Sequence, residues 1–107
     1  MLARLVRLYL HPAQVEAFLA LYAEARPRIE AQPGCLGVQL VRQQDDAAAF
    51  ATWSLWTDAE ALERYRHSPF FGELWPRVRR LLRRPAEAVS FEVVASSFAP
   101  QRATPPA

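Results

Sequence analysis

The sequence predicts an α+β, ferredoxin-like βαββαβ fold, in which an antiparallel sheet of four strands carries two helices on one face. Three observations support this prediction. Strand-like and helix-like periodicities alternate in the order strand, helix, strand, strand, helix, strand. The chain has 107 residues, 51% of them hydrophobic, which suits one domain with one core. Apolar residues also occupy both faces of several strands, so a second copy should cover the free sheet face in a homodimer.

The first strand is expected over residues 2–10, where alternation places Arg4 on one face with apolar residues at every second position. An arginine among apolar neighbours needs an anionic or carbonyl partner. If this face looks toward the helices, Arg4 is a candidate to bind a substrate oxygen. If it looks toward a second copy, Arg4 should pair with a carboxylate such as Glu92.

The first helix should begin at Pro12, and residues 32–34 should end it, because Pro33 disfavours a helical conformation in the residue before it. Pro27 is expected to kink its last turns, and Gly34 can take a positive φ at its end. The apolar residues of this segment follow helical spacing: Val15, Phe18, Leu19, Tyr22, Ala25 and Ile29.

Two strands should follow, over residues 35–42 and 49–56, because the polar run 43–46 separates two apolar segments. They are expected to pair as an antiparallel hairpin. The third strand ends on aromatic residues, and the periodicity changes from strand to helix at Thr57.

Two helix starts follow in close succession. Thr57 with Glu60 is typical of a capping box, and Ser68 with Pro69 is typical of an N-cap followed by the first helical residue. The sequence therefore predicts a short helix, a break at 67–68 and a longer helix. The longer helix should carry the apolar residues Phe70, Phe71, Leu74, Trp75, Val78, Leu81 and Leu82.

Pro85 should end the helical pattern, and a last strand is expected over residues 88–98. The domain then covers residues 1–98. Residues 99–107 carry too little apolar surface to order themselves, so they are predicted to form a disordered C-terminal tail.

The composition and charge argue against several kinds of functional site. Cys35 is the one cysteine, which excludes an intrachain disulfide and a cysteine-based metal cluster, and a reducing cytoplasm is the expected location. No segment approaches the ~20 apolar residues of a membrane span. The net charge is +2 and five arginines lie between residues 77 and 84, a pattern that favours a solvated helix face over a nucleic-acid site.

The segment 53–75 is expected to form the wall of any ligand site, because it holds six of the twelve aromatic residues, including all three tryptophans. Trp53 and Trp56 either pack in the core, the commoner role, or line a pocket. Trp75 precedes Pro76, where a helix irregularity could open space for a ligand.

The chain resembles the antibiotic biosynthesis monooxygenase domain family at residues 56–62, 65–71 and 33–35, and the resemblance covers roughly residues 2 to 95. It implies a dimeric α+β barrel with a ligand pocket between sheet and helices. Family members include cofactor-free oxygenases of quinols and anthrones, which need no flavin, metal or nicotinamide. Many relatives carry a histidine three residues before the serine of the Ser-Pro step; this chain has Tyr65 there and His67 two positions on.

The resemblance thus implies a cofactor-independent monooxygenase that oxidises a small aromatic quinol or anthrone-like substrate with O₂, without cofactor or metal. The candidate catalytic residues are Tyr65 and His67. The candidate substrate-binding residues are Arg4, Trp53, Trp56, Phe71 and Trp75. The alternative is a non-catalytic, dimeric small-ligand-binding or stress-associated module of the same fold. In both cases we expect a small aromatic ligand as partner, and neither nucleic acid nor a membrane.

Overall fold

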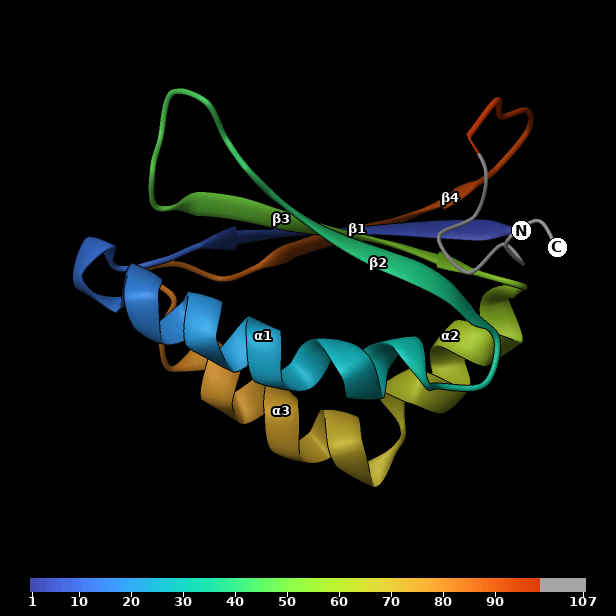
Figure 1. Ribbon diagram of the computed structural model, residues 1–107, viewed down its shortest axis with the longest axis horizontal. Helices are drawn as coiled ribbons and strands as arrows, with labels where there is room; N and C mark the ends of the chain where they lie inside the picture. Colours follow the sequence, from blue (N-terminus) through green and yellow to red (C-terminus); the bar gives the residue numbers. More distant parts are fainter. Residues whose placement is uncertain (99–107) are drawn as a thin grey trace, which may run out of the picture.

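The computed structural model describes residues 1–98, so the predicted tail 99–107 lies outside the described residues. Its elements follow the predicted order, and the segment after the third strand forms two successive helices, as predicted (Figure 1). They are β1 (Leu2–Tyr9), the 3₁₀ helix η1 (Pro12–Gln14), α1 (Val15–Glu30), β2 (Cys35–Arg42), β3 (Ala49–Trp56), α2 (Ala59–Arg66), α3 (Pro69–Arg79) and β4 (Glu87–Glu92).

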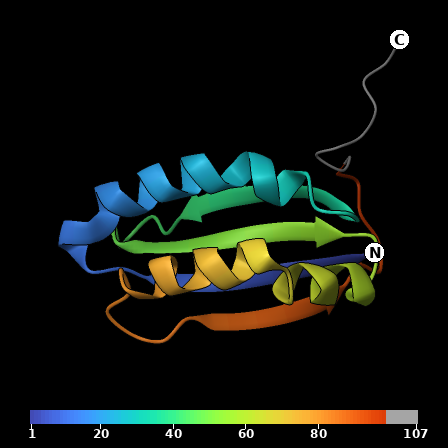
Figure 2. The ribbon, with the colours of Figure 1, turned by 90° about the horizontal axis from the view of Figure 1, so that it is seen from below.

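The four strands form one antiparallel sheet in the order β2-β3-β1-β4. The three α-helices of residues 1–98 lie against one face of this sheet, and within these residues the other face carries no helix (Figure 1). Seen from the helical side, α1 runs beside α2 and α3 across that face (Figure 2). The α+β, ferredoxin-like fold predicted from the order of elements is therefore confirmed.

The strand register decides which side chains meet the helices. Residues at even positions of β1 and β3 face the helices, with Val6 opposite Thr52 and Leu8 opposite Phe50. The odd positions, among them Trp53 on β3, lie on the helix-free face. The two faces of one strand therefore have different partners, and only one of them contributes to the space between sheet and helices.

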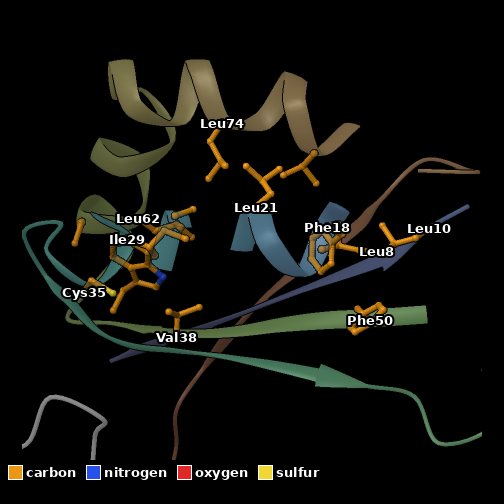
Figure 3. Packing of buried hydrophobic residues seen from close by; sticks show 14 residues of the cluster. Leu8, Leu10, Phe18, Leu21, Ile29, Cys35, Val38, Phe50, Leu62 and Leu74 are labelled. Carbon is orange, nitrogen blue, oxygen red and sulfur yellow. The ribbon is translucent and has the colours of Figure 1, made fainter. Parts of the chain in front are cut away.

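The core fills the layer between the helices and the sheet (Figure 3). Leu21 and Leu74 point into it from α1 and α3, while Val38 and Phe50 point into it from the sheet. Trp56 is fully buried, and its indole Nε1 donates a hydrogen bond of 2.9 Å to Ser54 Oγ. This bond satisfies the polar atom that a buried tryptophan brings into a core.

The start of the two later helices confirms one predicted cap and corrects the other. Ser68 Oγ accepts a hydrogen bond of 3.1 Å from Phe71 N, as predicted for an N-cap followed by Pro69. The cap of α2 is Asp58, whose carboxylate accepts from Ala61 N at 2.8 Å, so the prediction of Thr57 was wrong. Thr57 N donates to Gly34 O at 2.9 Å, which ties this residue to the turn before β2.

Two predicted elements end several residues earlier than expected. Helix α3 ends at Arg79, because the following residues pair with the end of the first strand: Leu82 bridges Leu10 and Arg83 N donates to Tyr9 O at 2.8 Å. Strand β4 ends at Glu92 instead of residue 98. Its one neighbour, β1, begins at Leu2, so no strand is available to pair with the residues beyond Val93.

Gly34 is a position where another residue should be costly. Its φ is +83°, and an added Cβ would overlap the Ala61 methyl group. We expect Gly34→Ala to lower the free energy of unfolding by at least ~2 kcal/mol, measured by urea denaturation. Gly72→Ala is the matched control: Gly72 lies inside α3 with nothing within 4 Å of an added Cβ, so helix propensity should raise stability by about 0.5–1 kcal/mol. Equal effects of both substitutions would contradict this account.

Candidate functional site

A cavity of about 110 Å³ lies between the sheet and the helices. Three strands and all three α-helices contribute to its wall. The lining residues are Val6, Leu8, Phe18, Leu21, Tyr22, Ala25, Ile29, Val38, Thr52, Ser54, Tyr65, Phe71, Leu74, Trp75 and Val78. This volume is of the order of an apolar cavity of ~150 Å³ that holds one benzene ring.

The cavity arises from the sizes of the residues on one face of the sheet. On the helix-facing side of β3, the large residues Phe50 and Trp56 stand at the two ends, and the smaller Thr52 and Ser54 stand between them. Val6 of β1 pairs with Thr52 and is also moderate in size. The ends of the layer are thus filled by aromatic rings while its middle stays open.

Aromatic rings form a continuous row along one side of the site. Trp56 stacks on Tyr65 with centroids 5.2 Å apart, and Tyr65 meets the edge of Phe71 at 5.1 Å. Phe71 in turn stacks on Trp75 at 6.0 Å. The break between α2 and α3 sets this geometry, because Ser68 Oγ donates to Tyr65 O at 2.7 Å while it caps the next helix. The step at Ser68 therefore places Tyr65 and Phe71 in contact.

Tyr65 is the candidate residue with the most altered acidity. Burial, with a smaller contribution from Cys35, raises the pKa of the Tyr65 phenol well above its usual range. The phenol therefore stays protonated at physiological pH. It can donate a hydrogen bond to an oxygen of a bound ligand, but it cannot act as a proton acceptor there.

The polar side chains of the cavity wall are all hydroxyl groups: Tyr22, Thr52, Ser54 and Tyr65. Burial likewise raises the pKa of Tyr22. Among the residues that the structure describes, those lining the cavity include no carboxylate, imidazole, ammonium or guanidinium group. The wall can therefore bind oxygen atoms of a ligand, yet it offers no group that titrates near neutral pH.

His67 lies outside the cavity. Its side chain is 79% exposed, and its Nδ1 sits 2.8 Å from Glu63 O and 3.5 Å from Glu63 Oε2 on the outer surface of α2. Two helical positions separate it from Tyr65, which is about 200° around the axis. The break at Ser68 does not turn His67 back toward the cavity, so the structure does not bring the two candidate catalytic residues together.

The other candidates are divided between the two faces of the sheet. Phe71 and Trp75 line the cavity, while Trp56 lies behind Tyr65 in the core. Trp53 lies on the helix-free face against Phe91, with centroids 5.9 Å apart. The placements of Trp53 and Trp56 follow from the alternation of side chains along β3. The two residues are three positions apart, so their side chains point to opposite faces of the sheet.

Arg4 lies on the helix side of the sheet but does not line the cavity. Its Nη1 donates to Ser90 Oγ at 3.0 Å, so Ser90 is its hydrogen-bond partner instead of the carboxylate of Glu92. Burial, more than the nearby Arg66, lowers its pKa, while Glu63 acts in the opposite direction. Even with this lowered pKa, the guanidinium of Arg4 remains charged under ordinary conditions.

The lining residues Thr52, Ser54, Tyr22 and Leu21 were not among the predicted site residues. The signal for Thr52 and Ser54 was present in the alternation of β3 between Phe50 and Trp56. Over residues 1–98, no group of three or more His, Cys, Asp or Glu side chains could hold a metal ion. None of the helices in this part of the chain combines the length and the apolar character that crossing a bilayer requires.

A family model described as antibiotic biosynthesis monooxygenase matches residues 1–75. Among solved structures, one named antibiotic biosynthesis monooxygenase is 25% identical, with a TM-score of 0.82 over 89% of this chain and 100% of the other. Rv0793 from Mycobacterium tuberculosis is 22% identical, with a TM-score of 0.82 over 91% and 98%. A variant of SnoaB, a cofactor-independent oxygenase from Streptomyces nogalater, is 23% identical, with a TM-score of 0.81 over 90% and 95%. No curated protein matches the chain.

Proposed function

The chain belongs to the antibiotic biosynthesis monooxygenase family, and we propose that it oxidises a small aromatic quinol or anthrone-like substrate with O₂, without a cofactor, in the cavity between sheet and helices. One observation carries this proposal: an apolar, ring-sized cavity in which a protonated tyrosine, Tyr65, stands beside the aromatic pair Phe71 and Trp75. The likeness to the SnoaB structure supports the reaction class.

The substrate itself supplies the electrons in this reaction. A deprotonated quinol transfers an electron to O₂, and the substrate radical and superoxide combine at a ring carbon. The resulting hydroperoxide loses water, so one oxygen atom becomes the new carbonyl oxygen and the other leaves as H₂O. The overall change is quinol plus O₂ to hydroxyquinone plus water.

The protein contributes exclusion of water and one directed hydrogen bond. Apolar walls from α1, α3 and the sheet keep bulk water from the reacting radicals. The phenol of Tyr65 donates to the substrate oxyanion, which holds the anion in place as charge develops. Because the lining has no proton acceptor among the described residues, the substrate binds as the monoanion that exists in solution. His67 lies on the outer surface and takes no part in this scheme.

Oxygen uptake by chelator-treated protein tests the proposal. We expect uptake of one O₂ per substrate molecule with hydroquinones, naphthoquinols or anthrones, above the autoxidation measured without protein. A quinol should give the hydroxyquinone and an anthrone the anthraquinone, each with water and without stoichiometric H₂O₂. Uptake equal to autoxidation across the panel would contradict an oxygenase.

The second candidate function is a non-catalytic module that binds a small aromatic ligand. Among the described residues, the cavity wall has no group that titrates near neutral pH, and this favours the binding module because such a wall binds a ring without activating it. Anaerobic titration calorimetry with the same panel separates the two functions. A ligand that binds with 1:1 stoichiometry and whose oxidation the protein does not accelerate would support the binding module.

We also propose that two copies pair through the helix-free sheet face. Large apolar residues stand exposed on this face, with Trp53, Phe91, Val89 and Val41 each about 39–44% exposed. Trp53 and Phe91 contact one another across β3, β1 and β4, so the exposed rings form one patch instead of scattered points. A patch of this kind on a small domain is typical of a protein interface. In a two-fold dimer both copies present the same surface, so a second copy supplies an apolar patch that matches this one.

A further inference from the structure

A second hollow lies on the outer side of α3. It has a volume of about 450 Å³, and it is lined by Trp75 and Arg79 of α3 and by residues 82–86, which connect this helix to β4. We call it the Arg79 groove. Its lining includes the apolar residues Leu82, Pro85 and Ala86, and its charged lining residues are arginines.

The Arg79 groove and the inner cavity share a wall. Trp75 lines both spaces, and its stacking on Phe71 at 6.0 Å holds the indole in this position. A ring inside the cavity and a substituent in the groove would therefore both contact this one indole.

The electrostatics of the groove favour an anion. Of the residues that the structure describes, three arginines line the groove and no carboxylate does. Arg83 and Arg84 are already held in place: Arg83 Nη2 lies 3.0 Å from Asp46 Oδ2, and the Arg84 guanidinium lies 3.9 Å from the centre of the Tyr9 ring. Fixed guanidinium groups lose little conformational freedom when they meet an anion.

Arg79 differs from other arginines near this end of α3, because it has no ion-pair partner among the described residues. Among residues 1–98 no carboxylate lies within 4.0 Å of its guanidinium, whereas Arg84 has Glu87 at 3.5 Å and Arg77 has Glu24 at 3.6 Å. An arginine has a planar fork of donors that matches a carboxylate. The charge of Arg79 is therefore the one in the groove that remains available to a ligand.

We propose that the Arg79 groove binds a carboxylate carried by the aromatic ligand whose ring occupies the cavity. This narrows the proposed substrate class from quinols and anthrones to monocyclic quinols with a short carboxylated side chain, because the cavity of about 110 Å³ has room for one ring and the groove receives the anion. This inference rests on the proposed function for the identity of the ring, but the binding step itself requires no oxidation.

Anaerobic titration calorimetry with homogentisate and ethylhydroquinone tests this inference. The two compounds share the ring and differ by a carboxylate in place of a methyl group. We expect wild-type protein to bind homogentisate roughly five- to tenfold more tightly, and the difference to shrink with added salt. Arg79→Gln should remove most of this difference and leave ethylhydroquinone binding unchanged. Arg80→Gln, which removes an exposed charge of the same helix end outside the groove, should preserve it.

Two results would overturn the assignment. One is equal affinity of wild-type protein for the two compounds. The other is equal loss of the difference in both variants, which would mean that the arginine cluster attracts anions without a defined site. Because the measurement is made without O₂, binding that follows the expected pattern upholds the groove even if the chain oxidises neither compound.

Discussion

Replacing Tyr65 by phenylalanine is expected to lower kcat/KM for oxygen uptake by roughly 100-fold, the cost typical of losing one hydrogen-bond donor to a developing oxyanion. The substitution removes only the hydroxyl group. The ring that stacks on Trp56 at 5.2 Å and meets Phe71 at 5.1 Å remains, so the shape of the cavity should persist. An oxygen electrode with the best substrate of the panel measures the effect.

His67→Ala is the matched control for this experiment. His67 lies 79% exposed on the outside of α2, and the variant should retain wild-type uptake. If His67→Ala lowered kcat/KM for oxygen uptake as much as Tyr65→Phe, the imidazole would take part in the reaction. That result would contradict the assignment of Tyr65 as the one side chain that assists it. Free energies of unfolding within about 1 kcal/mol of wild type would exclude a folding defect in either variant.

The pH dependence of the wild-type rate distinguishes a donor from a base. Because burial raises the pKa of Tyr65, the phenol remains a donor up to at least pH ~10, the pKa of an unperturbed tyrosine. Among the described residues, those that line the cavity carry no group that titrates near neutral pH. The rate should therefore rise with the first ionisation of the substrate and should shift when a more acidic quinol is used. A rise at the same pH for all substrates would reveal a base in the protein.

Most of the fold follows from local patterns in the sequence. The strand bounds of β2 and β3 agree with the prediction to the residue, because a proline-glycine turn and a polar run mark their ends. The errors have long-range causes. Helix α3 stops before Leu81 because the next residues pair with β1, and β4 stops at Glu92 because β1 begins at Leu2. No window of sequence contains that information.

The site was harder to predict than the fold, for two reasons. Simple alternation already separates Trp53 from Trp56, so grouping both as substrate-binding residues conflicts with a strand over 49–56. Tyr65, Phe71 and Trp75, by contrast, come together only because the chain breaks at Ser68 and starts a second helix. The sequence shows that this break exists, but the angle between α2 and α3 depends on packing against the sheet.

Placing a charge on the helix-free sheet face should have the largest effect on assembly. We expect wild-type protein to sediment as a dimer and Trp53→Glu to sediment as a monomer, with the dissociation constant raised by roughly a thousandfold or more. The reason is that each apolar ring withdrawn from water contributes about 2 kcal/mol, and a two-fold interface contains every residue twice. Phe91→Glu, its neighbour at 5.9 Å, should act in the same direction.

The control for charge alone is His67→Glu, which adds a carboxylate to the exposed surface of α2 and should leave the dimer intact. Sedimentation velocity over a hundredfold range of concentration measures all three variants. Since Trp53 and Phe91 do not line the cavity, the isolated subunit should retain its binding of the aromatic ligand. A wild-type protein that stays monomeric throughout this range would show that the exposed rings meet something other than a second copy. Loss of ligand binding on dissociation would instead mean that pairing of the sheets holds the helix layer, and with it Tyr65 and Trp75, in the geometry that the cavity requires.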